Sequence, residues 1–120
     1  MSRILVAEDD KFLSNAYRVK LDKSGFEVIM AKDGNEAIDH LENSDPDILL
    51  LDLIMPNKDG FEVLEHMNDT GLIDEVPVVI TSNLGQKEDI DKAKSLGAKD
   101  YIIKSDSSIN DLVDKIKSYL

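Results

Sequence analysis

Residues 48–56 read Ile48-Leu49-Leu50-Leu51-Asp52-Leu53-Ile54-Met55-Pro56, an apolar run that one acidic residue interrupts. Four consecutive large apolar side chains are typical of a strand that is buried on both faces, as in a parallel sheet. The run is too short to cross a bilayer, which takes about 20 apolar residues. Because burying an unpaired carboxylate is costly, Asp52 at the end of this strand is a candidate for chemistry.

Four other short apolar segments flank this run, and amphipathic stretches separate them. The segments are residues 3–7, 27–30, 76–80 and 101–103. Apolar residues recur at helical spacing at Leu13, Ala16, Tyr17 and Leu21, and again at Ile109, Leu112, Val113 and Ile116. Glycines at positions 25, 71 and 97 mark helix ends, and Ser107 or Ser108 is a candidate cap for the last helix.

A strand followed by a helix, repeated five times, predicts an α/β fold. We expect a doubly wound sheet of five parallel strands, with five helices distributed over its two faces. A chain of 120 residues suits a single domain over residues 1–120, built around one hydrophobic core.

The balance of charged residues excludes some classes of binding partner. Asp and Glu number 25 against 14 Lys and Arg, which gives a formal net charge of −11. This excess argues against direct binding of nucleic acid or of an anionic membrane surface, because both depend on cationic side chains. The absence of cysteine excludes disulfides and thiolate metal sites, and the short apolar start of the chain does not resemble a signal peptide. We therefore expect a soluble protein of the cytoplasm.

Polar side chains follow the predicted strands at the points where they end. They are Glu8, Asp9 and Asp10 after the first strand, Asp52 after the third, Thr81, Ser82 and Asn83 after the fourth, and Lys104 after the fifth. In doubly wound sheets these carboxyl ends form the ligand-binding crevice. Carboxylates crowded together bind protons or a cation, and an oxygen-rich site with few protein ligands suits Mg²⁺. A lysine and a hydroxyl beside it suit phosphoryl transfer, with Asp52 as a nucleophile that forms an acyl phosphate.

In order and spacing, these residues resemble the receiver domains of two-component response regulators, the CheY-like family. The resemblance covers residues 3–120 and includes Asp59-Gly60 after the apolar run. It implies the strand order 2-1-3-4-5. It also implies that Asp52 is the phosphoacceptor and that Lys104 and Ser82 assist the transfer. For the metal, Mg²⁺ with Mn²⁺ as an alternative, it implies the ligands Glu8, Asp9, Asp52 and the backbone carbonyl of Ile54.

The same resemblance implies a mechanism of signalling. A histidine kinase or a phosphotransfer protein would donate the phosphoryl group, and Ser82 and Tyr101 would act as switch residues. The surface of helix four, strand five and helix five would then change and signal to a downstream protein. Such a domain catalyses its own phosphorylation and dephosphorylation and is not a turnover enzyme. We expect a monomer, with dimerisation on activation as an alternative.

Three positions depart from the commonest pattern of that family. Ser105 follows Lys104 where proline in a cis peptide is usual, and a cis bond without proline costs about 3–4 kcal/mol. The sequence therefore leaves the cis or trans state of the Lys104–Ser105 bond open. Asn83 stands where a small residue is usual, and Glu8 replaces an aspartate.

Other interpretations of the same residues compete with this one. A degenerate receiver could act as an interaction module that needs no phosphorylation, and the domain could belong to a larger regulator or hybrid kinase. A phosphatase of the haloacid-dehalogenase type needs a second aspartate where Ile54 stands. A flavodoxin-like cofactor binder needs a phosphate-cradling loop where this chain has three acids.

Single residues also have simpler interpretations. Asp9 and Asp10 could cap the first helix, and Lys104 could be a surface lysine. His40 and His66 have no ligand partner at useful spacing, so we expect neither to bind a metal.

Overall fold

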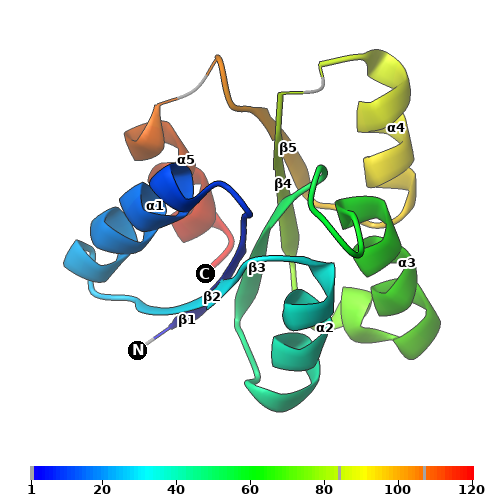
Figure 1. Ribbon diagram of the computed structural model, residues 1–120, viewed down its shortest axis with the longest axis horizontal. Helices are drawn as coiled ribbons and strands as arrows, with labels where there is room; N and C mark the ends of the chain where they lie inside the picture. Colours follow the sequence, from blue (N-terminus) through cyan, green and yellow to red (C-terminus); the bar gives the residue numbers. More distant parts are fainter. Residues whose placement is uncertain (1, 84, 107) are drawn as a thin grey trace.

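The computed structural model describes residues 2–83, 85–106 and 108–120, and within these ranges five strands alternate with five α-helices (Figure 1). The strands are β1 (Arg3–Ala7), β2 (Glu27–Ala31), β3 (Ile48–Asp52), β4 (Val78–Ser82) and β5 (Asp100–Ile103). The helices are α1 (Lys11–Lys23), α2 (Gly34–Asn43), α3 (Gly60–Thr70), α4 (Lys87–Ser95) and α5 (Ile109–Ser118), with a short 3-10 helix η1 (Leu72–Asp74) after α3. All strand pairs are parallel, in the order β2-β1-β3-β4-β5. The predicted fold class and strand order are confirmed.

The three central strands form the buried part of the sheet. β3 and β4 are buried along their whole length, and β1 is buried from Ile4 onward. The apolar runs that form β2 and β5 are also typical of strands buried on both faces, but both strands are largely half-exposed. Both lie at an edge of the sheet and have a neighbouring strand on one side alone.

The fourth strand begins two residues later than the apolar run at 76–80 predicts. The N–H of Val76 donates to the carbonyl of Leu72 at 2.9 Å, so Val76 completes the turn after η1. Pro77 has no N–H to donate, although its carbonyl accepts from Leu49 at 3.0 Å. Thr81 and Ser82 consequently lie inside β4 rather than after it.

Helices cover the sheet on both faces, with α1 and α5 on one side and α2, α3 and α4 on the other (Figure 1). The apolar faces predicted for α1 and α5 are confirmed, because Tyr17 and Leu21 pack with Leu112, Val113 and Ile116 against the sheet. A second cluster on the opposite face includes Val63, Leu64 and Met67 of α3. The sheet is therefore held between two apolar layers, and its carboxyl edge remains open to polar groups.

Several helices begin at an acidic or hydroxyl cap. The Asp10 carboxylate accepts hydrogen bonds from the N–H groups of Phe12 and Leu13, at 2.9 and 3.2 Å. Ser108 caps α5 in a capping box with Asp111, whereas Ser107, the other predicted candidate, lies outside the described residues. The three helix-ending glycines, at positions 25, 71 and 97, adopt positive φ, as their place after a helix predicts.

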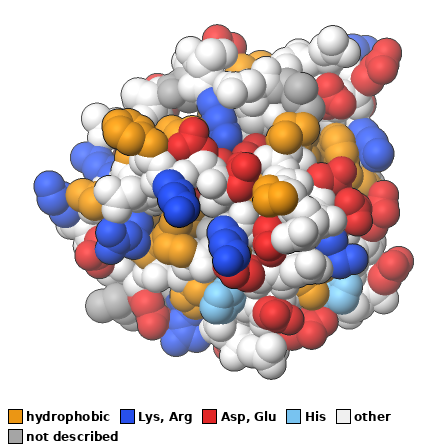
Figure 2. Space-filling view, viewed as in Figure 1, with side chains coloured by type: hydrophobic (Ala, Val, Ile, Leu, Met, Phe, Trp, Pro, Cys, Tyr) orange, Lys and Arg blue, Asp and Glu red, His pale blue; other side chains and the backbone are white. Residues whose placement is uncertain are grey.

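The net negative charge is distributed unevenly over the two faces. Helix α1 carries Lys11, Arg18, Lys20 and Lys23 against the single acid Asp22, whereas α2 and α3 together carry six acids and no Lys or Arg. Figure 2 shows Lys and Arg gathered over the α1 side and Asp and Glu over the opposite side. Among the described residues no helix is long and apolar enough to cross a membrane.

The α1 helix allows a matched test of the packing. Leu21 is fully buried and Val19, two residues earlier, is 41% exposed. We expect Leu21→Ala to lower the free energy of unfolding by about 2–5 kcal/mol, because it leaves a cavity in the core. Val19→Ala should cost less than about 1 kcal/mol. Urea unfolding followed by circular dichroism measures both, and equal losses would contradict the observed orientation of α1.

Candidate functional site

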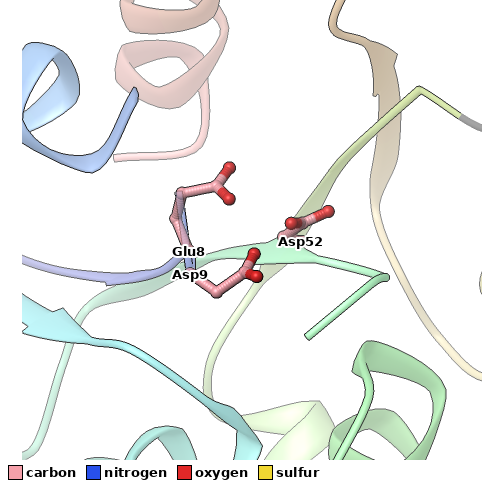
Figure 3. A group of neighbouring side chains, drawn as sticks. All are labelled: Glu8, Asp9 and Asp52. Carbon is pink, nitrogen blue, oxygen red and sulfur yellow. The ribbon is translucent and has the colours of Figure 1, made fainter. Parts of the chain in front are cut away.

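Three carboxylates meet at the carboxyl edge of the sheet. Ala7 of β1 pairs with Leu51 of β3, so the residues that follow them, Glu8 and Asp52, lie at the same level of two adjacent strands. One carboxylate oxygen from each of Glu8, Asp9 and Asp52 lies within 4.8 Å of the other two. Figure 3 shows the three side chains extending from the ends of β1 and β3 into a common space. The structure therefore brings together the three side-chain ligands predicted for the metal.

Two of these carboxylates are withdrawn from water. Glu8 is 3% exposed and Asp52 is 4% exposed, whereas Asp9 is exposed. Burial raises the pKa of Asp52 to about 7, and the charge of Glu8 adds to the increase. The charge of Lys104 acts in the opposite direction and is outweighed. Without a further cation, Asp52 is therefore partly protonated near neutral pH.

Lys104 is the cation within this group. Its Nζ lies 2.6 Å from Glu8 Oε1 and 3.3 Å from Asp52 Oδ2, and its backbone N–H donates to the Ser82 carbonyl at 2.9 Å. Although burial alone would lower it, the pKa of Lys104 is raised by its hydrogen bond to Glu8 and by the charge of Asp52. The interpretation of Lys104 as a surface lysine is wrong, since its side chain is only 12% exposed and ion-paired.

An open cavity of about 330 Å³ lies over these groups. Its walls are Glu8, Asp9, Asp10, Leu13, Asp52, Ile54, Asn83 and Lys104. Three carboxylates with one ammonium leave an excess of negative charge, and the negatively charged atoms that could bind a metal are all carboxylate oxygens. This donor set fits a hard divalent cation such as Mg²⁺, which keeps several waters and takes one or two carboxylates from the protein.

The two predicted switch residues contact each other beside this cavity. Ser82 ends β4 with its side chain buried, and a hydrogen bond joins it to the side chain of Tyr101, which is half-buried on β5. Ser82 does not line the cavity, whereas the neighbouring Asn83 does. Thr81 lines a separate small cavity with Tyr17 and Lys104 on the side of α1 and α5, as the alternation of side chains along a strand requires.

The acidic residues after β1 have different partners. Asp10 caps α1, so the capping interpretation is right for Asp10, whereas Asp9 takes part in the carboxylate group. The N–H of Asp10 also donates to Glu8 Oε2 at 3.2 Å, which connects the third acid of this run to the first. In the loop after β3, the N–H of Ile54 lies 3.4 Å from Asp52 Oδ1. The Ile54 backbone thus adjoins the carboxylates.

Other polar residues lie apart from this group. Nδ1 of His40 lies 3.0 Å from the hydroxyl of Ser44, and Nε2 of His66 lies 3.0 Å from a carboxylate oxygen of Glu42.

No cis peptide bond occurs within the described ranges, so the bond between Lys104 and Ser105 is trans.

Sequence reasoning missed a contact beside the predicted metal ligands. Nδ2 of Asn57, in the loop between β3 and α3, donates to Oδ2 of Asp33 at 2.6 Å. Asp33 is 6% exposed and also caps α2. Its position before a helix predicts a cap, but no feature of a single sequence indicates that it also binds a loop 24 residues away.

The chain is similar to known response regulators over nearly its whole length. Response regulator RR06 of Streptococcus pneumoniae is 35% identical over 117 residues, which cover 98% of this chain and 52% of that protein. The transcriptional regulatory protein CpxR of Escherichia coli K12 is 36% identical over 120 residues, which cover all of this chain and 50% of that protein. The chain thus spans about half the length of these curated relatives.

The chain is also similar to solved structures of response regulators. The receiver domain of the Francisella response regulator 1452 superposes with a TM-score of 0.92 at 28% identity, covering 99% of this chain and 96% of that one. The response regulator TrrA of Thermotoga maritima, solved in complex with Mg²⁺-BeF, has a TM-score of 0.86 at 24% identity and matches over the full length of both chains. Residues 4–117 match the family described as the response regulator receiver domain. The chain therefore belongs to the response regulator receiver domain family of two-component signalling.

Proposed function

We propose that residues 1–120 form one receiver domain that accepts a phosphoryl group on Asp52. The observation that carries this proposal is the environment of the Asp52 carboxylate. It is buried at a strand end, 3.3 Å from the Lys104 ammonium and within 4.8 Å of carboxylate oxygens of Glu8 and Asp9. A purely structural role for Asp52 does not account for two other acids at that distance, because the three carboxylates repel one another.

The donor set supports a Mg²⁺ site, with Mn²⁺ as an alternative. Asp9, Asp52 and the carbonyl of Ile54 would hold the ion directly, and Glu8 would reach it through water. The Mg²⁺-BeF complex of the similar protein TrrA supports the same choice of metal. When bound, the ion neutralises the carboxylates and the oxygens of the transferring phosphoryl group.

In the proposed transfer, an oxygen of Asp52 attacks the phosphorus of a phosphohistidine on a histidine kinase or phosphotransfer protein. A bond forms between that oxygen and phosphorus while the bond from phosphorus to the histidine nitrogen breaks. The Lys104 Nζ, already within 3.3 Å of the nucleophile, binds a phosphoryl oxygen and holds the group in line. The domain acts on itself, through uptake and later loss of the phosphoryl group, and is not a turnover enzyme.

The signal would pass through Ser82 and Tyr101. The Ser82 hydroxyl exchanges Tyr101 for a phosphoryl oxygen, and the Tyr101 side chain repacks against β5. This changes the surface of α4, β5 and α5 that a downstream protein binds. A shift from mostly inactive to mostly active requires phosphorylation to favour the active state by about 5.5 kcal/mol.

The first test is chemical. Acetyl phosphate with MgCl₂ should modify the wild-type protein, and Asp52→Asn should abolish the modification because the nucleophile is lost. Intact-mass spectrometry and peptide mapping measure the product. Asp39→Asn makes the same change at an exposed position of α2; it is the matched control and should behave as wild type. Modification of Asp52→Asn would refute the proposal, and an unmodified wild type would favour the interaction module that needs no phosphorylation.

A second test examines the lysine. We expect Lys104→Gln to slow phosphorylation by acetyl phosphate by about 10²–10³-fold, the usual cost of removing a charged group that stabilises a transition state. Lys94→Gln, on the exposed surface of α4, should leave the rate unchanged. The initial rates of mass gain at equal Mg²⁺ concentration decide the comparison. Equal rates for Lys104→Gln and wild type would remove Lys104 from the mechanism.

The raised pKa of Asp52 predicts how stability depends on pH in Mg²⁺-free buffer. In the folded protein the pKa of Asp52 is about 7, whereas aspartates in the unfolded chain have a pKa of about 3.9. Protonation of Asp52 therefore stabilises the folded state relative to the unfolded state. The stabilisation this gives is complete below the unfolded pKa and is lost as the pH rises through about 7. Asp52→Asn should therefore unfold at higher urea than wild type at about pH 8, by a margin that shrinks toward about pH 4. Saturating MgCl₂ should abolish the margin, and a margin unaffected by pH would contradict the argument.

A further inference from the structure

The loop between β3 and α3, residues 53–59, carries the Ile54 carbonyl. The Ile54 side chain is 60% exposed, so packing of that side chain cannot hold its backbone in place. Contacts of the neighbouring loop residues must do so. Asn57 is one of the described non-glycine residues at positive φ, 68°, a conformation that asparagine tolerates better than most residues.

One contact on this loop comes from Asp33 at the start of α2. Asp33 Oδ1 accepts the N–H of Glu36 at 2.9 Å, and Oδ2 accepts from Asn57 Nδ2 at 2.6 Å. Both hydrogen bonds lower the pKa of Asp33, that from Glu36 more, so the carboxylate is charged. Hydrogen bonds to an ionised acceptor are shorter and roughly twice as strong as neutral ones.

A second contact involves the next residue on each side. A Cβ placed on Gly34 would lie 2.3 Å from the carbonyl oxygen of Lys58 and 2.5 Å from its Cβ. Any side chain at position 34 would therefore push the two loops apart. Asp33 contacts Asn57 and Gly34 lies against Lys58, so the start of α2 contacts two consecutive residues of the loop.

The far end of the loop is closed by α3 itself. The N–H of Gly60 donates to the Leu53 carbonyl at 2.9 Å, and Asp59 caps α3 in a capping box with Glu62. A Cβ on Gly60 would lie 2.6 Å from the carbonyl oxygen of Asp52. Leu53 and Met55, on either side of Ile54, are buried in the core, and the contacts of Asn57 and Lys58 hold the rest of the loop.

We propose that Asp33, Gly34 and Asn57 form a clamp that positions the Ile54 carbonyl for the divalent cation. This inference rests on the proposed function of the carboxylate site. The three are positioning residues, because they act through the loop backbone and do not touch the ion. Mg²⁺ demands nearly octahedral geometry, so a displaced carbonyl costs affinity. Removal of groups that orient metal ligands typically weakens metal binding by about 10–100-fold.

Two substitutions remove the clamp while they preserve other roles of the residues. Asp33→Ser retains a side chain that caps α2 but is too short to reach Asn57. Asn57→Gly retains a residue suited to positive φ but removes the amide. We expect each to weaken the affinity for Mg²⁺ about tenfold, measured by NMR titration of the folded protein with MgCl₂. The double variant should bind no more weakly than either single one, since both remove the same contact.

A control separates loss of positioning from general destabilisation. Asn68 at the other end of α3 donates to the Leu96 carbonyl at 2.5 Å, so Asn68→Ala also removes a hydrogen bond between distant segments. It should lower the unfolding midpoint in urea without changing Mg²⁺ affinity. If Asp33→Ser and Asn57→Gly bind Mg²⁺ as wild type does, the clamp is refuted and the phosphoryl site stands. If wild type itself binds no Mg²⁺, the proposed function fails and this inference fails with it.

Discussion

Mutual repulsion among Glu8, Asp9 and Asp52 is the constraint on which the arrangement of this protein depends. Three carboxylates with oxygens within 4.8 Å of one another, two of them buried, would separate if their backbones were free to move. They cannot, because β1 and β3 are hydrogen-bonded neighbours whose side chains are almost entirely buried between helices. The free energy of packing the sheet thus maintains a charge arrangement that is unfavourable in itself, as is usual at functional sites.

The surrounding elements reduce the repulsion without removing it. Lys104 reaches the group from β5 and pairs with Glu8 and Asp52, while α1 begins directly beside the acids, where its first N–H groups favour negative charge. Neither contribution is sufficient, since the pKa of Asp52 still rises to about 7. The fold therefore leaves a deficit of positive charge at one place, and the proposed binding of a divalent cation and the proposed phosphoryl chemistry both depend on that deficit.

The features that could be predicted from the sequence are those that follow from local order. An apolar run that ends in a carboxylate indicates both a buried strand and a candidate functional residue, and parallel pairing brings such ends to one edge. Strand limits were less accurate where tertiary contacts intervene, as at Val76, whose N–H completes the turn after η1. Contacts between distant loops were not predictable. The hydrogen bond from Asn57 to Asp33 and the preference of Lys104 for Glu8 depend on where loops settle, which no spacing in one sequence encodes.

The uneven distribution of charge over the two faces has a consequence for encounters in solution. With a basic α1 on one face and six acids on α2 and α3 on the other, the molecule has a dipole moment across the thickness of its sheet as well as a net charge. A charged partner that approaches within a Debye length, about 8 Å at physiological ionic strength, exerts a torque on such a molecule. An acidic partner is repelled by the net charge and yet turned toward α1, so orientation precedes contact. Collisions in which α1 faces the acidic partner then become more frequent than other collisions. Added salt would reduce this alignment as well as the repulsion.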